Sequence, residues 1–275
     1  WSPERIAVFR SGARGVLEAL VAANQTSFDA PLAGRHVDAA RLRNLCEAEC
    51  MLRWSEGRVD EAVEAWLAGV QFLLDVEAVQ WLQSVPFTDA DLAELPPAVR
   101  STLAAGLARA DARLATIVDP RAELANFTLP LCDGSYRLWD WDARELVRAW
   151  RFGFDPAAQH LLGLQELFAA MPSAGAADAT GEQREAEWAR VKPAMDTWLS
   201  WYVHEITHEH EQARRRVCAR FRMVRLALAF HAREELPAVV DPWNGDPFEV
   251  VVDGDTAMLR AREEFEGREW VAVRQ

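Results

Sequence analysis

The stretch "EGRVDEAVEAWLAGVQFLLDVEAVQWLQSV", residues 56–85, decides the fold class of this chain. From residue 59 onward its apolar side chains recur every three or four residues, which is the spacing of one helix face. Residues 38–56 show the same spacing, and the tight turn "EGR" separates the two runs. Two helices joined by so short a turn pack side by side, so we predict an antiparallel helical hairpin.

The hairpin resembles a single tetratricopeptide-type unit around Gly57, Asp60 and Trp66. No second copy follows at the 34-residue period of such repeats, so we expect an irregular array of helices rather than a regular repeat array. A helix interrupted at its glycines is expected over residues 4–24.

Further helices are expected in the middle of the chain. The stretch "TDADLAELPPAVRSTLAAGLARADARLATI", residues 88–117, predicts a short helix, a break at the two prolines and a second helix. Pro97 suits the first turn of that second helix, because the N–H that proline lacks has no helical partner there. Residues 119–140 have weak periodicity and are expected to be an extended connection.

Residues 184–236 are helical in pattern almost without interruption, apart from Pro193. We therefore predict one long helix of about 40 residues after that proline. The preceding segment "PSAGAADATGEQ", residues 172–183, is small and polar, so we expect a mobile loop there.

The character of the sequence changes after residue 240, where short β-favouring runs alternate with turn signals. Asp253-Gly254 between "FEVVV" and "TAMLRA" predicts a hairpin, and "REWVAV" predicts another strand. The predicted fold is mostly α, an irregular multi-helix array with a small C-terminal antiparallel β unit. We expect a helical domain over residues 1–240 and a β unit over residues 241–275 that packs on the last long helix.

The composition restricts the classes of partner. The net charge is −13 and the isoelectric point is about 5.0. Binding to phosphates needs clustered Lys and Arg, so no nucleic-acid partner is expected. The local basic run Arg214-Arg215-Arg216 follows Glu209 and Glu211, and we expect it to form a solvated helix face with i,i+4 ion pairs.

No run of 18 apolar residues is present, so no membrane span is expected. The chain begins at Trp1 rather than methionine, so we expect that an upstream piece has been removed, which leaves a lost signal peptide or membrane anchor open. Cys46 and Cys50 are one helical turn apart, which is a poor spacing for a disulfide, and no second cysteine pair supports a metal site. We expect buried free thiols.

The motif "HEITH", residues 204–208, is the feature that points to chemistry. Histidines at positions i and i+4 share a helix face and can both ligate Zn²⁺, while the glutamate between them can activate a bound water. His204 and His208 are therefore candidate zinc ligands, and Glu205 is a candidate catalytic residue.

The surroundings of the motif count against a zinc peptidase. His210 is about 200° round the helix from His208, so it cannot be the third ligand unless the helix breaks there. His36, His160 or a carboxylate from another segment could serve, but nothing in the sequence selects one of them. Glu209 directly follows the second histidine and Trp201 lies three residues before the first, both of which depart from the usual signature. His204 and His208 lie opposite the apolar stripe of the helix, where either solvent or a cleft would be. We expect a surface-histidine turn, with a zinc site as the alternative.

The C-terminal part carries a specific order of turn residues, Leu236-Pro237, Asp241-Pro242-Trp243, Gly245 and Pro247-Phe248, followed by the predicted hairpin. Together with "EGRVDEAV", this order resembles a group of uncharacterised helix-rich bacterial envelope proteins. The ending is also similar to the soluble part of type II secretion pseudopilins, in which a long helix packs on a small sheet.

The resemblance covers most of the chain loosely and residues 225–260 more specifically. It departs from the group at "HAREE", residues 231–235, where a glycine-containing stretch is shortened. It implies an envelope setting and no catalytic residues. The residues themselves suggest a structural motif, because Pro242 and Pro247 fix φ while Gly245 permits a positive φ.

These observations favour a non-catalytic scaffold or binding protein, envelope-associated or exported, that acts on a protein partner through helical surfaces. The alternative is a zinc-dependent metallohydrolase, a peptidase that uses the motif at 204–208 with zinc as its cofactor. A partner-recognition module of a secretion or pilus-like assembly is a third possibility that rests on the C-terminal resemblance. A cytoplasmic location stays open.

Overall fold

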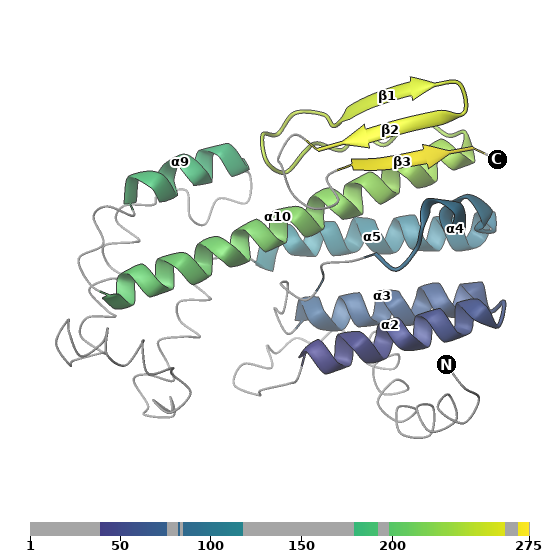
Figure 1. Cartoon of the computed structure of the whole chain (residues 1–275), viewed down its shortest axis with the longest axis horizontal. Helices are drawn as coiled ribbons and strands as arrows, with labels where there is room; N and C mark the ends of the chain where they lie inside the picture. Colours follow the sequence, from purple (N-terminus) through teal and green to yellow (C-terminus); the bar gives the residue numbers. More distant parts are fainter. Residues whose placement is uncertain are drawn as a thin grey trace. The chain divides into compact units, whose positions relative to one another are not determined.

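The computed structural model describes residues 39–75, 82, 85–117, 179–191, 198–261 and 269–274, and the structural statements that follow concern these residues. They form six helices and one three-stranded antiparallel sheet (Figure 1). The chain is therefore mostly α with a small C-terminal antiparallel β unit, as predicted. The helix expected over residues 4–24 and the connection expected over residues 119–140 lie outside the described residues.

The described residues belong to two compact units that are discontinuous in sequence. The first unit contains the residues up to 114, those from 216 to 241 and those from 246 onward. The second contains the residues from 115 to 215 and the short segment 242–245. The predicted division into domains at residue 240 stays a prediction.

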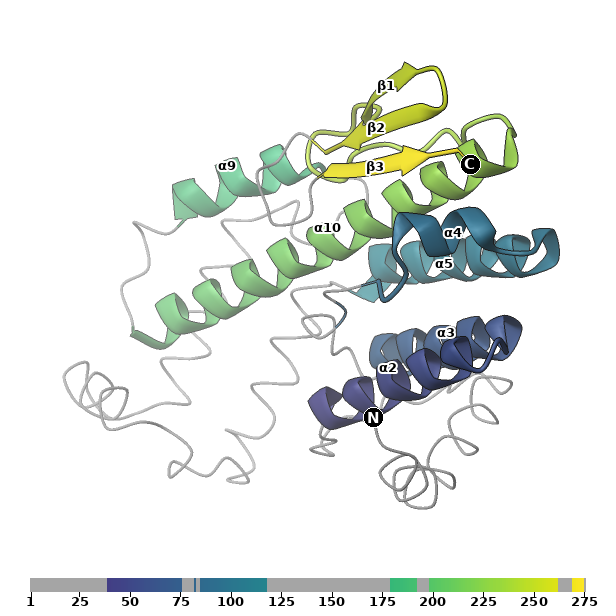
Figure 2. The ribbon, with the colours of Figure 1, turned by 45° about the vertical axis from the view of Figure 1, so that its right-hand side comes forward.

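In the first unit, helices α2 (Ala39–Ser55) and α3 (Val59–Asp75) form the predicted antiparallel hairpin, and the two lie side by side in Figures 1 and 2. Helix α2 ends because Gly57 adopts a φ of +75°, a conformation that costs glycine little. The N–H groups of Gly57 and Arg58 then donate to the carbonyls of Trp54 and Arg53, both at 2.9 Å. This pattern satisfies the carbonyls of the last helical turn and reverses the chain.

The second helix of the hairpin is shorter than predicted. Helix α3 ends at Asp75, and neither residue 82 nor Val85 is helical, so the predicted continuation to residue 85 is wrong. At Val85 the reason is Pro86, because the ring of a proline disfavours the helical conformation of the residue before it.

The two helices of the hairpin approach each other closely at Gly69. A Cβ atom at this position would lie 2.7 Å from Cβ of Cys46 on α2. Cys46 and Cys50 are buried free thiols, as predicted. Burial, with a smaller contribution from the nearby Glu47 carboxylate, raises the pKa of the Cys46 thiol to about 11 and that of Cys50 to about 12. Both side chains are therefore protonated at neutral pH and pack as small apolar groups.

Helices α4 (Asp89–Glu94) and α5 (Pro97–Ile117) confirm the prediction of two helices separated by a Pro-Pro break, with Pro97 as the first residue of α5. Thr88 caps α4, because its hydroxyl oxygen accepts from the N–H of Asp91 while the Asp91 carboxylate accepts from the N–H of Thr88 at 2.7 Å. This reciprocal pair is the capping box.

Helix α10 (Trp198–Ala232) confirms the long helix predicted after Pro193, although it ends at residue 232 rather than 236. Arg233 closes it with a φ of +57°, and the N–H of Glu234 donates to the carbonyl of Ala229 at 3.0 Å. A left-handed residue at this place ends a helix in the same way as Gly57 ends α2.

The predicted apolar stripe of α10 is buried in the first unit at Val217, Phe221, Val224 and Leu228. Phe221 meets the edge of Trp66 from α3, with ring centroids 6.1 Å apart. Asp111 of α5 forms an ion pair with Arg222 of α10 at 2.9 Å. An apolar core and the ion pairs of Asp111 with Arg222 and Arg225 therefore hold α3, α5 and this part of α10 together.

The sheet consists of β1 (Glu249–Asp253), β2 (Thr256–Arg260) and β3 (Glu269–Val273) in the order β1-β2-β3. The predicted hairpin and additional strand are confirmed, but the turn is shifted by one residue. Asp253 pairs with Thr256, so the central residues are Gly254 and Asp255 rather than Asp253 and Gly254. Gly254 has a φ of +59° and Asp255 does not share this conformation, so glycine occupies the one turn position with positive φ.

Two side chains, the carboxylate of Asp89 and the guanidinium of Arg274, attach the sheet to the helices. Asp89 at the start of α4 lies 2.8 Å from Nε2 of His231, and it accepts from Nε1 of Trp270 at 3.0 Å and from the N–H of Val273 at 2.9 Å. Arg274, next to β3, donates to the carbonyl of Phe230 at 2.9 Å. Helices α4 and α10 are therefore both joined to β3, which is the strand nearest α10 in both views of the ribbon.

We predict that Gly69→Ala destabilises the chain by about 1–3 kcal/mol, because the added methyl group meets Cβ of Cys46, which is fixed to the backbone of α2. Gly106→Ala on α5 is the matched control, because the added methyl meets only the flexible end of Leu67. Urea unfolding should show a clearly smaller loss for this control. If Gly69→Ala instead stabilised the chain, as helix propensity alone would dictate, the close packing of α2 on α3 would be contradicted.

Candidate functional site

The motif at residues 204–208, for which a zinc site is the alternative interpretation, lies within α10, so these residues are helical as expected. Of the three candidate residues, the structure describes the side chain of His208. The side chains of His204 and Glu205 lie outside the described part of the chain.

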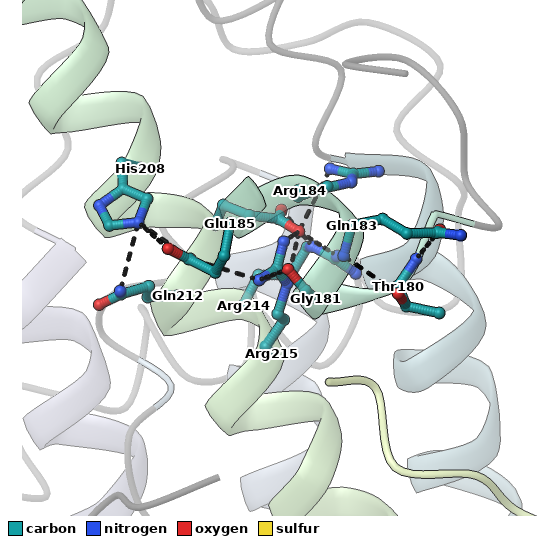
Figure 3. Close-up of polar contacts among 10 residues, drawn as sticks. Thr180, Gly181, Gln183, Arg184, Glu185, His208, Gln212, Arg214 and Arg215 are labelled. Carbon is teal, nitrogen blue, oxygen red and sulfur yellow. Dashed lines mark hydrogen bonds and ion pairs between the residues drawn. The ribbon is translucent and has the colours of Figure 1, made fainter. Parts of the chain in front are cut away.

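His208 contacts a carboxylate from helix α9 (Gly181–Val191). Its Nε2 lies 2.9 Å from each carboxylate oxygen of Glu185 and 3.4 Å from the amide nitrogen of Gln212 (Figure 3). The ring of Trp188 meets the imidazole edge-on at 5.7 Å. Because a carboxylate only accepts, Nε2 carries a hydrogen in this arrangement. His208 is thus half-buried between two helices rather than on the solvated face that the sequence predicts.

Helix α9 begins inside the segment predicted as a mobile loop, so that prediction is wrong for residues 181–183. Thr180 is its N-cap. The Thr180 hydroxyl accepts from the N–H of Gln183 at 3.3 Å, and the Gln183 side chain accepts from the N–H of Thr180 at 2.9 Å. This capping box starts the helix and fixes the position of Glu185 one turn later.

The carboxylate of Glu211, one turn after His208, is surrounded by three guanidinium groups. They belong to Arg184, Arg214 and Arg215, which Figure 3 labels. Glu211 accepts from Arg214 at 2.6 and 2.8 Å and from Arg215 at 2.9 Å, and Nη1 of Arg184 from α9 lies 3.2 Å away. The side chain of Glu211 is 1% exposed. A buried carboxylate is tolerated only when such partners replace its water.

The predicted solvated face at Arg214-Arg215-Arg216 is therefore wrong for its first two members. Arg214 and Arg215 are buried, whereas Arg216 is exposed. The i,i+4 pair between Glu211 and Arg215 is present as predicted. The difference arises because α9 and residue Trp243 cover this side of α10, with the Arg215 guanidinium 4.8 Å from the centroid of the Trp243 ring.

The same partners set the ionisation of Glu211. Burial alone would raise the pKa of its carboxyl group, but the hydrogen bond from Arg214 and the charges of Arg214, Arg215 and Arg184 outweigh burial and lower the pKa. Glu211 is accordingly charged at neutral pH, and its charge contributes to holding α9 against α10.

The segment "DPWNG", residues 241–245, has the structural role that its residues suggested. The carbonyls of Pro242 and Trp243 accept from the N–H groups of Gly181 and Glu182 at 3.2 and 2.8 Å. These are free donors at the first turn of α9, so the segment caps the helix. A Cβ at position 181 would lie 2.8 Å from Cα of Trp243, and Gly245 has the expected positive φ of +78°.

The polar side chains around Glu211 and His208 bind one another. Within the ranges that the structure describes, no three His, Cys, Asp or Glu side chains converge as metal ligands would. Sequence reasoning missed Glu185 and Arg184 because both come from a separate helix. The available signal was the i,i+4 spacing of Arg184 and Trp188, which places both on the buried face of α9.

In the first unit, a shallow cleft of about 390 Å³ lies between α5 and the end of α10. Leu228 and Ala229 form part of its apolar lining, together with Arg100 and Arg225 as basic groups and Glu234 and Glu235 as acidic groups. The two charge types balance, so the cleft has no net preference for an anion or a cation.

The sheet exposes apolar side chains that a core would normally cover. Val251, Val252, Val271 and Val273 are each 45–54% exposed. Cross-strand pairing places Val251, Met258 and Val271 in one row. We call the face that carries this row and Val273 the outer face. The opposite face carries Ala257, Leu259 and Ala272, all of them buried.

A row of charges borders the apolar row on the outer face. Arg260 on β2 lies 3.6 Å from the carboxylate of Glu249 on β1 and 2.8 Å from that of Glu269 on β3. The outer face thus combines an apolar row with a polar rim, as protein-binding surfaces do.

No protein-family model matches the chain, and no curated protein and no solved structure matches it. In the described ranges, none of the helices combines the length and the apolar character needed to cross a membrane. The functional proposal therefore rests on the geometry of the chain itself.

We predict that Glu211→Gln destabilises the second unit by about 3–5 kcal/mol, because it leaves three buried guanidinium groups without their carboxylate. Because the folded state lowers the pKa of Glu211, its contribution is present above the unfolded value near 4.5 and is lost as pH falls through the folded value. Amide exchange in α9, measured between pH 7 and pH 3, should report both effects.

The exposed Glu182 in the first turn of α9 provides the control. Glu182→Gln makes the same charge change and should cost less than about 1 kcal/mol, since it loses only an interaction with the helix dipole. Equal losses in the two variants would refute the structural role of the buried carboxylate.

Proposed function

We propose that this chain is a non-catalytic binding protein whose protein partner docks on the outer face of the C-terminal sheet. One observation carries the proposal. Six large hydrophobic side chains of the described residues are exposed. Three of them, Val251, Val271 and Val273, lie on the outer face, and a fourth, Val252, belongs to the edge strand of the same sheet. Neighbouring exposed apolar side chains on a folded protein are the usual mark of an interaction surface.

The sheet is also well supported for such a role. The carboxylate of Asp89 and the guanidinium of Arg274 attach β3 to the helices, so the outer face is held in place before any partner arrives. A preformed surface binds without first having to be ordered, which favours affinity.

The described helices expose fewer large hydrophobic side chains than the sheet does. In the helical part that the structure describes, Met51 is the large hydrophobic side chain that stands exposed. We therefore assign the binding surface to the sheet rather than to the helical surfaces expected from the sequence. An envelope-associated or exported setting, and a role as a scaffold there, rest on the resemblance stated above and remain part of the proposal.

The proposal predicts that a photo-crosslinking residue placed at position 251 or 271 captures one discrete protein in cells that express the chain. The same residue at Glu64, an exposed position on α3, is the control and should not capture it. Mass spectrometry identifies the captured peptide. Capture that is equally strong at position 64, or absent from positions 251 and 271, would refute the proposal.

A second candidate function is the zinc-dependent hydrolase of the motif at residues 204–208. The observation that favours it is the position of Glu185, whose carboxylate contacts His208, the one candidate ligand whose side chain is described. Two ligands of one tetrahedral zinc ion lie about 3.3 Å apart, so the 2.9 Å between Nε2 of His208 and Glu185 needs only a small adjustment. Zinc would replace the hydrogen on Nε2, and Glu205 would be the group that activates the bound water.

Metal analysis of protein purified without added zinc separates the two candidates. For a binding protein we expect zinc far below one equivalent per chain. One equivalent that is lost in His208→Ala and Glu185→Gln, but kept in Glu187→Gln as the matched control on α9, would establish the zinc site. That result would also overturn the non-catalytic proposal if His204→Ala abolished the zinc as well.

A further inference from the structure

We infer that the partner binds as an additional β-strand along β1, and that it carries a basic residue at each end of a short apolar segment. This inference rests on the proposed function, because it specifies how the partner is held and what its chemistry is. Three observations support it: β1 is an edge strand in the described sheet, its valines are exposed, and acidic residues stand at its two ends.

The first step concerns the backbone of β1. Asp253 and Thr256 close a two-residue turn, and such a closing pair exchanges hydrogen bonds across the hairpin. The direction of the backbone groups alternates along a strand, so the N–H and C=O groups of Val250 and Val252 point away from β2. The same alternation holds on β3. Val273 lies opposite Thr256, whose backbone groups point to β1, so the N–H of Val273 points away from β2 and donates to Asp89.

The two edges of the sheet therefore differ. Asp89 occupies the outward N–H of Val273 on β3, whereas β1 is the opposite edge strand in the order β1-β2-β3. Among the described residues, no backbone group pairs with the four outward groups at Val250 and Val252, so these four can bind a partner. An extended segment that adds to such an edge gains main-chain hydrogen bonds whatever its side chains are.

The second step concerns the side chains. Val251 points to the outer face and is 47% exposed, while Val252 points to the opposite face and is 54% exposed. A strand beside β1 would place one side chain next to Val251 and two on the other face, next to Val250 and Val252. Three consecutive apolar residues in the partner would cover these valines.

The third step concerns charge. Glu249 and Asp253 stand at the two ends of β1, on the same face as Val251, and both are exposed. Arg260 lies 3.6 Å from Glu249, but the Glu249 side chain remains 53% exposed. Like charges directly opposite each other destabilise a strand pair, whereas opposite charges stabilise it.

This charge pattern excludes a second copy of the chain as the preferred occupant. Antiparallel pairing of β1 with itself, centred on Val251, sets Glu249 against Asp253 of the other copy. Parallel pairing sets Glu249 against Glu249. Each arrangement brings acidic side chains together at both ends, so the occupant is a foreign segment of the pattern basic, apolar, apolar, apolar, basic.

The test uses three synthetic peptides with the whole chain. The first has the core lysine, three valines, lysine; the second has glutamates in place of both lysines; the third repeats the first with N-methyl groups on the backbone nitrogens that face β1. We expect the lysine peptide to bind about tenfold more tightly than the glutamate peptide, with the difference shrinking at high salt, and the methylated peptide not to bind. Fluorescence anisotropy measures affinity, and amide exchange should show protection at Val250 and Val252.

Two variants locate the peptide. Val252→Pro removes only an outward N–H, so β1 still pairs with β2, but the edge can no longer accept a strand. We expect it to abolish binding of the lysine peptide while the exchange rates of Thr256 and Met258, whose N–H groups point to β1, stay unchanged. Met51→Thr on α2 is the control and should bind normally. In Glu249→Gln/Asp253→Asn, the preference for lysine over glutamate should disappear.

The outcomes separate this inference from the proposed function. Normal peptide binding by Val252→Pro, equal affinity for the lysine and glutamate peptides, or a dimer of the chain that Val252→Pro abolishes would each overturn the inference. If crosslinking at positions 251 and 271 persisted undiminished in Val252→Pro, the chain would still be a binding protein, but its partner would lie on the outer face and not along the edge. Absence of that crosslink in the unaltered chain would overturn both.

Discussion

The carboxylate of Asp89 is the contact on which the C-terminal part of the first unit depends. It accepts from Trp270 and from the N–H of Val273 in β3 and lies against His231 near the end of α10, residues that are 142 to 184 positions away in sequence. A sheet this small is stable only when it has a packed hydrophobic face or lies against a helix. Asp89 fixes β3 to two helices and so holds the sheet in place. The valines of the outer face can therefore stay exposed in a folded sheet.

The acidic side chains of this chain are used in two opposite ways. Glu211 is buried and neutralised by three arginines, so its charge contributes to the interior of the second unit. Glu249 and Asp253 stay exposed at the ends of an edge strand, where they hinder pairing between copies. A net charge of −13 therefore does not describe a uniformly acidic surface, because part of it lies in ion pairs that solvent does not reach.

Elements that depend on local pattern were predictable from the sequence, and contacts between distant elements were not. The helical hairpin, the Pro-Pro break, α10 and the three strands follow from periodicity and turn residues within a few positions of each other. The turn of the sheet was misplaced by one residue, because the register depends on cross-strand pairing and not on the Asp-Gly dipeptide alone. Arg214 and Arg215 were expected in solvent because the helix that buries them begins more than 30 residues upstream, and Glu185 could not be selected as the neighbour of His208 for the same reason.

Burial of the Cys46 and Cys50 thiols makes them resistant to oxidation in the folded protein. Disulfide formation and most oxidation reactions begin with the thiolate, and the folded protein keeps both groups almost entirely in the thiol form. Once α2 and α3 have packed, the protein can pass through an oxidising or a reducing compartment without changing its covalent structure at these positions. The unfolded chain has no such protection, so the redox fate of these cysteines is decided by whether the hairpin closes before an oxidant arrives.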